Sequence, residues 1–395
     1  MKYASVTDRV AGLGGAKWEL HLRAKAMVAA GQAIIMLSIG EPDVPPPPAL
    51  LRAATEGIAA GRTGYSNGRG EPRLLAALAA RYSARSGRAI GTDQILCLPG
   101  TQTALFAVLS ALVGHGDEVL TGDPMYATYE GVIAATGARM VPVPLRPEHG
   151  FRMQAADLAA AGTARSRVLF LNTPHNPTGA VLTPADIAAL GEVARAHDLW
   201  IFSDEVYEEL VFPGASFASP LSIPALADRV IVASSISKSH AAPGFRSGWC
   251  VGPAEFSARL LPLAEAMLFG NQPFIADMTA LAVAAPSTVA PGMVARFSDR
   301  AARLGARLNG VAGLQVNRPE AGMFVLLDVR ATGLDGVTFC DRLLDEQSVA
   351  ATPGESFGSS LGGWVRLSLT QPDEVMDKAA GRIAEFARSI GGQSA

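Results

Sequence analysis

Short apolar runs alternate with helical patterns through the middle of the chain. Runs with the length of a buried strand lie at 118–121, 139–143, 167–171, 199–203, 229–233 and 248–252, and apolar residues recur at helical spacing over 101–113, 129–136 and 184–196. Strands that are apolar on both faces and separated by helices are typical of parallel sheets with right-handed crossovers. The pattern therefore predicts an α/β unit with a mostly parallel sheet flanked by helices.

The last third of the chain has a different pattern. Strand-like runs at 323–329 and 364–369 alternate with helical spacing over 294–308, 338–346 and 373–388. This order predicts a smaller α+β domain. The first 45 residues contain no sheet of their own, so we expect a large domain over 46–285 and a small domain made of 1–45 and 286–395.

Composition narrows the class of protein. Of the 395 residues, 49% are hydrophobic and 17% are charged, which supplies a large core and excludes general disorder. No apolar stretch approaches the roughly 18 residues of a membrane span. The first residues lack the apolar core of a signal peptide, so we expect a cytoplasmic protein. A net charge of −3 gives no attraction to nucleic acid.

Cysteine and histidine positions predict neither disulfides nor a metal site. Cys97, Cys250 and Cys340 are far apart and odd in number, which is typical of a reducing compartment. No two histidines have the spacing of a metal-binding pair. The glycine-rich segment 12–17 resembles a phosphate loop but lacks the Gly-Lys-Ser/Thr ending and follows no strand, so we interpret it as a flexible N-terminal arm.

Reactive residue types gather where predicted strands end. Segments 172–179, 204–207 and 234–238 directly follow three of the predicted strands and contain amide, carboxyl, phenol, hydroxyl and amine groups. Ligands of open α/β sheets bind beyond the carboxyl ends of the strands. We therefore expect these groups to line one crevice.

Lys238 is notable because only five of the 33 basic residues are lysines. Most lysines are solvated at the surface, and from the residue alone that interpretation stays open. A partly buried lysine has a lowered pKa and a nucleophilic amine that can form a Schiff base, whereas an arginine stays protonated. An amine retained at a strand end in an arginine-rich chain favours the second interpretation.

With its neighbours included, the chain resembles the pyridoxal-phosphate-dependent aminotransferases of class I/II. The resemblance runs from Gly40-Glu41-Pro42-Asp43 to Arg366-Leu367-Ser368 in the family's order. The stretches M-Y-x-T-Y-E, S-H-A and P-G-x-x-F-G resemble most closely the bacterial arginine–pyruvate transaminases. The resemblance implies the aspartate aminotransferase fold (fold type I), with a large cofactor-binding domain, a smaller α+β domain and pyridoxal 5'-phosphate as cofactor.

The resemblance assigns roles around the cofactor ring. Lys238 would bind the aldehyde, and Asp204 would keep the pyridine nitrogen protonated so that the ring acts as an electron sink. Tyr207 and Asn176 would hold the phenolic oxygen. Taken alone, Asp204 could be a helix cap and Asn176-Pro177 a turn. The resemblance also implies a cis peptide before Pro177.

The same resemblance implies that the cofactor phosphate is bound by a helix start and by the segment around the lysine. The residues are Gly100, Thr101, Gln102, Ser235, Ser237 and Arg246. A helix start offers amide donors to an anion. The eight residues from Lys238 to Arg246 match the family's spacing. Without these neighbours, the Gly-Thr-Gln turn would be only a helix cap.

Two tyrosines and an arginine complete the implied site. Tyr126 would stack on the cofactor ring, and Tyr65 would reach the phosphate of the partner subunit, which implies a homodimer with shared active sites. Arg366 would hold the substrate α-carboxylate in a bidentate contact, helped by the backbone of Gly40 and by Asn176. Without the resemblance, each would be an ordinary core, interface or surface residue.

Two departures from the family bear on the site and the substrate. The lysine is followed by H-A-A-P-G-F-R, where many relatives have Met-Thr-Gly-Trp-Arg. No basic residue lies between Arg259 and Arg296, the region in which animal-type aspartate enzymes carry the arginine for the side-chain carboxylate. The second departure weakens the case for aspartate as donor. An arginine donor would require acidic or polar groups at the pocket mouth, which the sequence does not identify.

The predicted activity is a ping-pong transamination from an L-amino acid to a 2-oxo acid. Pyruvate is the first expectation for the acceptor, and the donor is arginine or another amino acid, which the sequence alone does not rank. Lys238 would move the proton as general base and acid. Three alternatives stay open: an aspartate or aromatic transaminase with 2-oxoglutarate, a β-elimination lyase, and a non-catalytic sensor that binds pyridoxal phosphate. Such sensors carry an N-terminal DNA-binding domain, for which residues 1–45 are too short.

Overall fold

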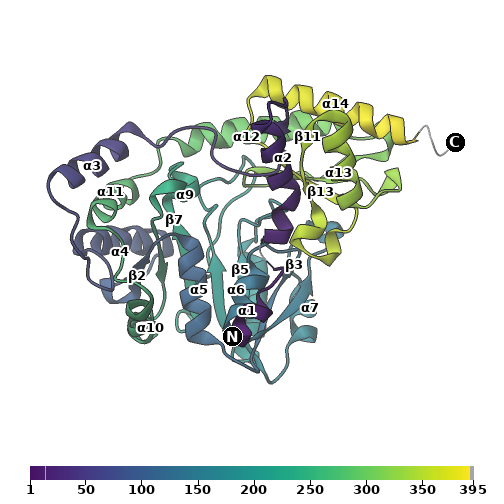
Figure 1. Ribbon diagram of the computed structural model, residues 1–395. Helices are drawn as coiled ribbons and strands as arrows, with labels where there is room; N and C mark the ends of the chain where they lie inside the picture. The colour runs from purple at the N-terminus through teal and green to yellow at the C-terminus, as the bar shows by residue number, and fades with distance from the viewer. Residues whose placement is uncertain (14, 392–395) are drawn as a thin grey trace.

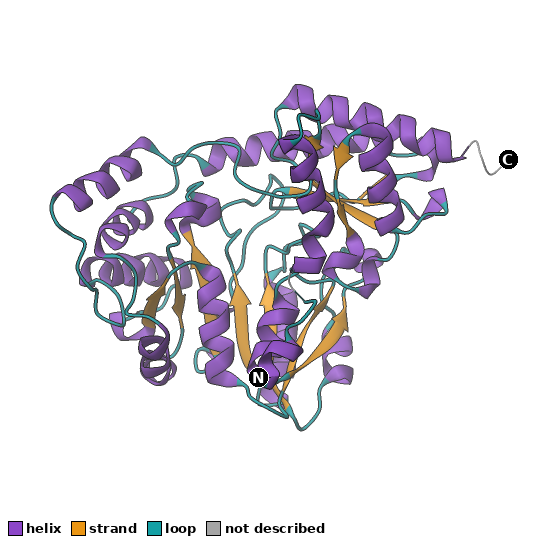
Figure 2. Cartoon of the chain, viewed as in Figure 1, coloured by secondary structure: helices purple, strands orange, loops and turns teal. Residues whose placement is uncertain are grey.

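The computed structural model describes residues 1–13 and 15–391. Its largest sheet has seven strands in the order β2-β8-β7-β6-β5-β3-β4. Their bounds are β2 (Ile95–Leu98), β3 (Glu118–Asp123), β4 (Arg139–Pro144), β5 (Ser166–Asn172), β6 (Trp200–Asp204), β7 (Val230–Ser235) and β8 (Gly248–Val251). Helices surround this sheet (Figures 1 and 2), which confirms the predicted α/β architecture.

The two faces of the sheet have separate cores. One core packs strand side chains against α5 (Thr101–Leu112), α6 (Tyr129–Thr136) and α10 (Ala254–Met267). The other packs them against α3 (Pro48–Ala59), α4 (Pro72–Ser86), α7 (Ala155–Ala161), α8 (Pro184–Ala196) and α11 (Pro273–Val283). In β2, Leu96 belongs to the first core and Cys97 to the second, because successive side chains of a strand point to opposite faces.

The strand at 248–252 departs from the parallel arrangement of the other strands in this sheet. β8 pairs antiparallel with both β7 and β2. The connection from β7 contains only α9 (Ile236–Ser239) and a short 3-10 turn. One helical turn rises about 6 Å, whereas a five-residue strand spans about 17 Å. The chain therefore turns back at the edge where the parallel strands end, and this return places the lysine segment there.

A second, antiparallel sheet has the order β12-β13-β10-β9. Its strands are β9 (Gln315–Val316), β10 (Phe324–Asp328), β12 (Thr352–Pro353) and β13 (Trp364–Ser368). A third core joins this sheet to α12 (Ala290–Leu308), α13 (Gly336–Gln347) and α14 (Asp373–Gly391). The predicted helices and strands of the last third are thus present.

The N-terminal residues contact both parts of the chain. α1 (Ser5–Arg9) packs on α6, whereas α2 (Glu19–Ala29) lies beside α13 (Figure 1). β1 (Ile35–Met36) pairs with β11 (Val349–Ala350). Of the segment interpreted as a flexible arm, residue 14 lies outside the described residues, and Lys17 forms an ion pair with Glu130 at 2.8 Å. The division of the chain into domains at 46 and 286 stays a prediction.

The described residues show neither a membrane-spanning helix nor a cluster of metal ligands. No helix among them is long and apolar enough to cross a membrane. They contain no group of three or more histidine, cysteine or acidic side chains that could hold a metal ion. All three cysteines are buried and free.

An ion cluster ties the connector after β1 to α12. Arg300 is 5% exposed and donates to Asp43 at 2.7 Å, to Asp373 at 2.6 Å and to the carbonyl of Leu369 at 2.9 Å. Arg296 donates to the same Asp43 at 2.8 and 3.0 Å. Burial opposes the charge of Asp43, but the hydrogen bonds from both arginines prevail and lower its pKa. The cluster therefore holds the Gly40-Glu41-Pro42 segment in place.

Replacing Arg300 with leucine should destabilise the fold by about 3 kcal/mol, because removing one member of a buried ion cluster leaves its partners uncompensated. Urea unfolding followed by tryptophan fluorescence measures the change. Arg259→Leu is the control, since its pair with Glu255 is exposed and should contribute about 0.5 kcal/mol or less. Equal losses in the two variants would contradict a special role for the cluster.

Candidate active site

A cavity of about 560 Å³ opens at the carboxyl edge of the seven-stranded sheet. Its walls come from the ends of β5, β6 and β7, the start of α5 and the strand β13. The predicted site residues that line it are Gly40, Thr101, Gln102, Tyr126, Asn176, Asp204, Tyr207, Ser235, Ser237, Lys238, Arg246 and Arg366. The fold thus brings these distant residues into one cavity.

Two predicted residues do not line the cavity. A Cβ atom at Gly100 would lie 2.2 Å from Nη2 of Arg246, and Gly100 has φ +83°. Only glycine therefore lets Arg246 approach the start of α5. Tyr65 is 94% exposed and packs edge-on against Phe269, with ring centroids 6.1 Å apart. Within its own chain, Tyr65 is not part of the site.

Asp204 is buried at the end of β6. Its Oδ2 accepts a hydrogen bond from the hydroxyl of Tyr129 at 2.8 Å, and its Oδ1 accepts one from the amide of Val206 at 3.2 Å. Burial raises the pKa of Asp204 to about 6, although these hydrogen bonds and the charge of Lys238 oppose the rise. The ionised carboxylate would be stabilised by a cation placed beside it.

Lys238 lies in α9, and its Nζ donates to the carbonyl of Gly40 at 3.3 Å. Burial lowers the pKa of Lys238 to about 8; the charges of Arg366 and Arg246 add to the decrease, and Glu41 opposes it. The amine is therefore easier to deprotonate than that of an exposed lysine.

Gly40 approaches the site closely. A Cβ atom there would lie 2.1 Å from the ring of Phe324, so a larger residue would push the Gly40 carbonyl away from Lys238.

Arg366 is a buried cation between two aromatic rings. It is 2% exposed, and its guanidinium carbon lies 4.2 Å from the ring centroid of Phe324 and 4.4 Å from that of Phe357. Nη1 donates to Asn176 at 3.0 Å and Nη2 to the carbonyl of Ser38 at 2.9 Å, while Nε has no partner in the described structure. Burial lowers the pKa of Arg366 to about 10.

The side chain of Asn176 connects Arg366 to Tyr207. Its Nδ2 donates to the phenol oxygen of Tyr207 at 3.4 Å. Burial raises the pKa of Tyr207, so the phenol keeps its proton. The peptide between Asn176 and Pro177 is cis, as expected, and so are the peptides before Pro124 and Pro174.

Hydroxyl groups and one guanidinium gather at the start of α5. The buried Thr101 hydroxyl has no hydrogen-bond partner in the described structure. Ser235 accepts from the amide of Ser237 at 3.3 Å. Arg246 is exposed and donates to the carbonyl of Pro243 at 2.9 Å. This end of the cavity can bind an anion, because it combines a helix start with a cation.

Two further residues line the cavity: Tyr129, which the sequence did not indicate, and Asn172, which lies in the predicted segment 172–179 but had no role assigned to it. Tyr129 is the first residue of α6, is 1% exposed and lies between Tyr126 and Phe170, with centroid distances of 5.6 and 4.3 Å. Asn172 donates to the carbonyl of Asp204 at 3.0 Å and accepts from the amide of Asn176 at 2.8 Å. For Tyr129, the available signal was a polar residue at the start of a helix.

Comparison with known proteins agrees with this geometry. The family Aminotransferase class I and II matches residues 32–383. The chain is 45% identical to the arginine–pyruvate transaminase AruH of Pseudomonas aeruginosa, with 100% of both chains covered. The solved aspartate aminotransferase of Rhizobium meliloti has a TM-score of 0.92 at 28% identity and covers 98% of this chain and 99% of its own.

A further solved relative is the aspartate aminotransferase of Thermus thermophilus with maleate. Its TM-score is 0.87 at 28% identity, with 98% of this chain and 97% of that chain covered. Both solved relatives thus match nearly the whole of this chain. The chain therefore belongs to the class I and II aminotransferases, enzymes that transfer an amino group between an amino acid and a 2-oxo acid.

Proposed function

We propose that this chain binds pyridoxal 5'-phosphate in the cavity and transfers the amino group of arginine to pyruvate. The observation that carries the proposal is Arg366, a buried guanidinium whose Nε has no partner in the described structure, in the same cavity as the amine of Lys238. A buried cation of this kind is stabilised by a bound anion, and its planar donors match a carboxylate.

The cavity residues fit the cofactor. The unpartnered Thr101 hydroxyl and the exposed Arg246 suit its phosphate, at a helix start that Gly100 leaves uncovered. Asp204, whose pKa is raised by burial, would regain its charge beside a protonated ring nitrogen. The hydroxyl of Tyr207 and the amide of Asn176 would donate hydrogen bonds to the phenolic oxygen of the cofactor.

When bound, the cofactor supplies an electron sink for negative charge at the substrate Cα. The chain's own residues do the rest. The Nζ of Lys238 accepts the Cα proton and later returns a proton, for which a pKa of about 8 is well suited. Arg366 holds the α-carboxylate and so aligns the Cα–H bond. The Thermus thermophilus relative solved with maleate, a dicarboxylate, supports carboxylate binding.

Two observations bear on the donor. The relative that is 45% identical over both full chains is named for arginine and pyruvate, which supports arginine. The cavity wall from the N-terminal segment consists of Trp18, His21, Leu22 and Ile39. Asp204 is the only acid among the described lining residues, which favours an aromatic or aliphatic donor as the second candidate.

A donor panel decides between these candidates. Arginine, aspartate, alanine and phenylalanine are each offered with pyruvate and with 2-oxoglutarate, and kcat/KM is measured for each pair. We expect arginine with pyruvate to have the highest value. Lys238→Ala should lose about 10²–10⁴-fold in rate, together with the visible absorbance of the bound cofactor. The exposed Lys378→Ala is the matched control, and normal turnover by Lys238→Ala would refute the mechanism.

The proposal includes a homodimer with shared active sites. Large apolar side chains are exposed at Leu51, Ile58, Tyr65 and Phe269. Tyr65 and Phe269 contact each other, and Leu51 and Ile58 line one surface pocket. Adjacent exposed apolar residues are typical of an interface. In such a dimer, Tyr65 would reach the phosphate site of the partner, which accounts for its position outside the cavity of its own chain.

Mixing two inactive variants tests the shared site. Tyr65→Ala and Lys238→Ala proteins are unfolded together, refolded and assayed. If each site uses Tyr65 from one subunit and Lys238 from the other, hybrid dimers carry one intact site, and about a quarter of wild-type activity returns. Each variant refolded alone is the control. Activity that stays at the level of the controls would contradict shared sites.

The Tyr129–Asp204 hydrogen bond predicts a change in pH dependence. The hydroxyl of Tyr129 stabilises the ionised carboxylate and lowers the pKa of Asp204. Tyr129→Phe therefore raises this pKa, so Asp204 is protonated at a higher pH and loses its charge earlier as the pH falls. We expect the acidic limb of the kcat/KM profile to move to higher pH. Tyr82→Phe, equally buried and outside the cavity, should leave the limb unchanged; an unshifted limb in Tyr129→Phe would refute this role.

A further inference from the structure

The helix that carries Lys238 is too short to hold itself in place. α9 spans only Ile236–Ser239, and an isolated helical turn is unstable because nucleation is unfavourable. Two residues after it, Ala241 has φ +50°, which is uncommon for a residue other than glycine. Such a conformation persists only where surrounding contacts impose it. The position of the Lys238 amine therefore depends on neighbouring elements.

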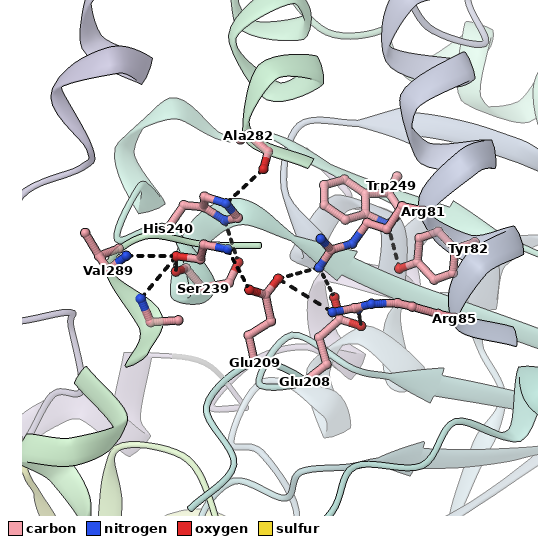
Figure 3. Close-up of polar contacts among 12 residues, drawn as sticks. Arg81, Tyr82, Arg85, Glu208, Glu209, Ser239, His240, Trp249, Ala282 and Val289 are labelled. Atoms are coloured by element: carbon pink, nitrogen blue, oxygen red, sulfur yellow. Dashed lines mark hydrogen bonds and ion pairs between the residues drawn. The ribbon is translucent and has the colours of Figure 1, made fainter. Parts of the chain in front are cut away.

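His240 provides the first of these contacts. It is 3% exposed, and its Nε2 lies 3.0 Å from the carbonyl oxygen of Ala282, at the end of α11. Its Nδ1 lies 2.9 Å from Oγ of Ser239 (Figure 3). A carbonyl only accepts, so Nε2 carries the hydrogen and Nδ1 accepts from the serine. Burial lowers the pKa of His240, although Glu209 opposes the shift, which agrees with a neutral ring.

Ser287 provides the second contact. Its hydroxyl donates to the carbonyl of Ser239 at 2.6 Å and accepts from the amides of Val289 and Ala290 at 3.2 and 3.1 Å. These amides lie at the start of α12. The turn that carries the lysine is thus bonded to the end of α11 through His240 and to the start of α12 through Ser287. We refer to Ser239, His240 and Ser287 as the His240 clamp.

A buried ion network supports the clamp from the side of α4. Glu209 accepts from the amide of Ser287 at 3.3 Å. It also pairs with Arg81 and, at 3.7 Å, with Arg85 (Figure 3). Arg81 also donates to Glu208 at 3.0 Å. Burial opposes the charge of Glu209, but Arg81 prevails and lowers its pKa. The loop that contains Ser287 is therefore fixed by a charged partner.

The same helix α12 also positions the other end of the lysine side chain. Its Arg296 and Arg300 bind Asp43, three residues beyond Gly40, whose carbonyl accepts from Nζ of Lys238. One element therefore controls both the backbone of Lys238, through Ser287, and its amine, through Gly40.

We propose that His240 and Ser287 are positioning residues that place the amine of Lys238 for proton transfer, an inference that rests on the role proposed above for Lys238. Neither side chain lines the cavity. A displacement of about 1 Å in a reacting group can cost about 10²-fold in rate. The clamp should therefore affect the rate of proton transfer. It should not affect substrate binding, because Arg366, which holds the substrate, forms no hydrogen bond with the clamp residues.

Three substitutions of His240 separate its two hydrogen bonds. His240→Leu removes both, and we expect kcat to fall about 10- to 100-fold while the KM of the donor stays within about 3-fold. A glutamine amide can replace Nε2 and reach Ala282, so His240→Gln should stay within about 3-fold of wild type. The shorter asparagine of His240→Asn reaches Ser239 but not Ala282, so its kcat should resemble that of His240→Leu. Ser287→Ala should also lower kcat, as His240→Leu does.

Tyr82→Phe is the matched structural control. Tyr82 is 2% exposed, lies beside the same ion network and accepts a hydrogen bond from Nε1 of Trp249 at 2.8 Å (Figure 3). Its loss should lower the melting temperature, because the indole N–H stays unpaired. It should leave kcat and KM per folded enzyme unchanged.

A second readout does not need the cofactor. Cofactor-free protein is reductively methylated with formaldehyde and cyanoborohydride over a range of pH, and the modification of Lys238 is followed by mass spectrometry. In wild type the midpoint should lie near the lowered pKa of about 8. In His240→Leu we expect it to rise by about one pH unit or more, since a loosened turn admits water to the amine.

The outcomes are decisive in both directions. A lower kcat with an unchanged KM and a raised labelling midpoint in His240→Leu, but not in Tyr82→Phe, supports the clamp. A wild-type kcat and midpoint in His240→Leu, or losses that only follow the amount of folded protein, would overturn it. If wild type transaminates no donor, the proposed function fails, and the labelling midpoints still decide whether His240 positions the lysine.

Discussion

Burial sets the charge states of the ionisable groups at the carboxyl edge of the seven-stranded sheet, and the chemistry of the site follows from these charge states. The pKa of Asp204 is raised to about 6, that of Lys238 is lowered to about 8 and that of Arg366 is lowered to about 10. Each shift has desolvation as its main cause and favours the neutral form. The carboxylate of Asp204 would therefore be stabilised by a cationic ligand atom and the guanidinium of Arg366 by an anionic one. The neutral amine of Lys238 is the form that can act as a nucleophile.

Two features of the chain path make this burial possible. The antiparallel return from β7 to β8 places Lys238 and Arg246 at the carboxyl edge of the sheet. Asn172 and Asp204, the last residues of β5 and β6, lie at the same edge. The helix α12 then joins the two large parts of the chain, with Ser287 at one end and the Asp43 cluster further along. These contacts bring Arg366 and Gly40 over the lysine.

The residues that the sequence could predict share one property: each carries its chemistry in a local pattern. Lys238, Asp204 and Asn176 follow apolar strands, and Arg246 lies at a fixed spacing from the lysine. Tyr129 and His240 carried no such pattern, because their partners come from segments that are distant in the chain. The strand β2 was not predicted either, since an apolar run of four residues does not distinguish helix from strand.

The α/β class, the strand ends that carry reactive groups and the resemblance to a family could all be recognised along the chain, because hydrophobic periodicity and strand-end residues are local properties. Three features emerge only from the packing of the folded chain: β8 runs antiparallel, Phe324 and Phe357 enclose Arg366, and His240 supports the lysine turn. These outcomes depend on which distant segments share buried space and on which polar groups must find partners there. A pattern read along the chain contains neither kind of information.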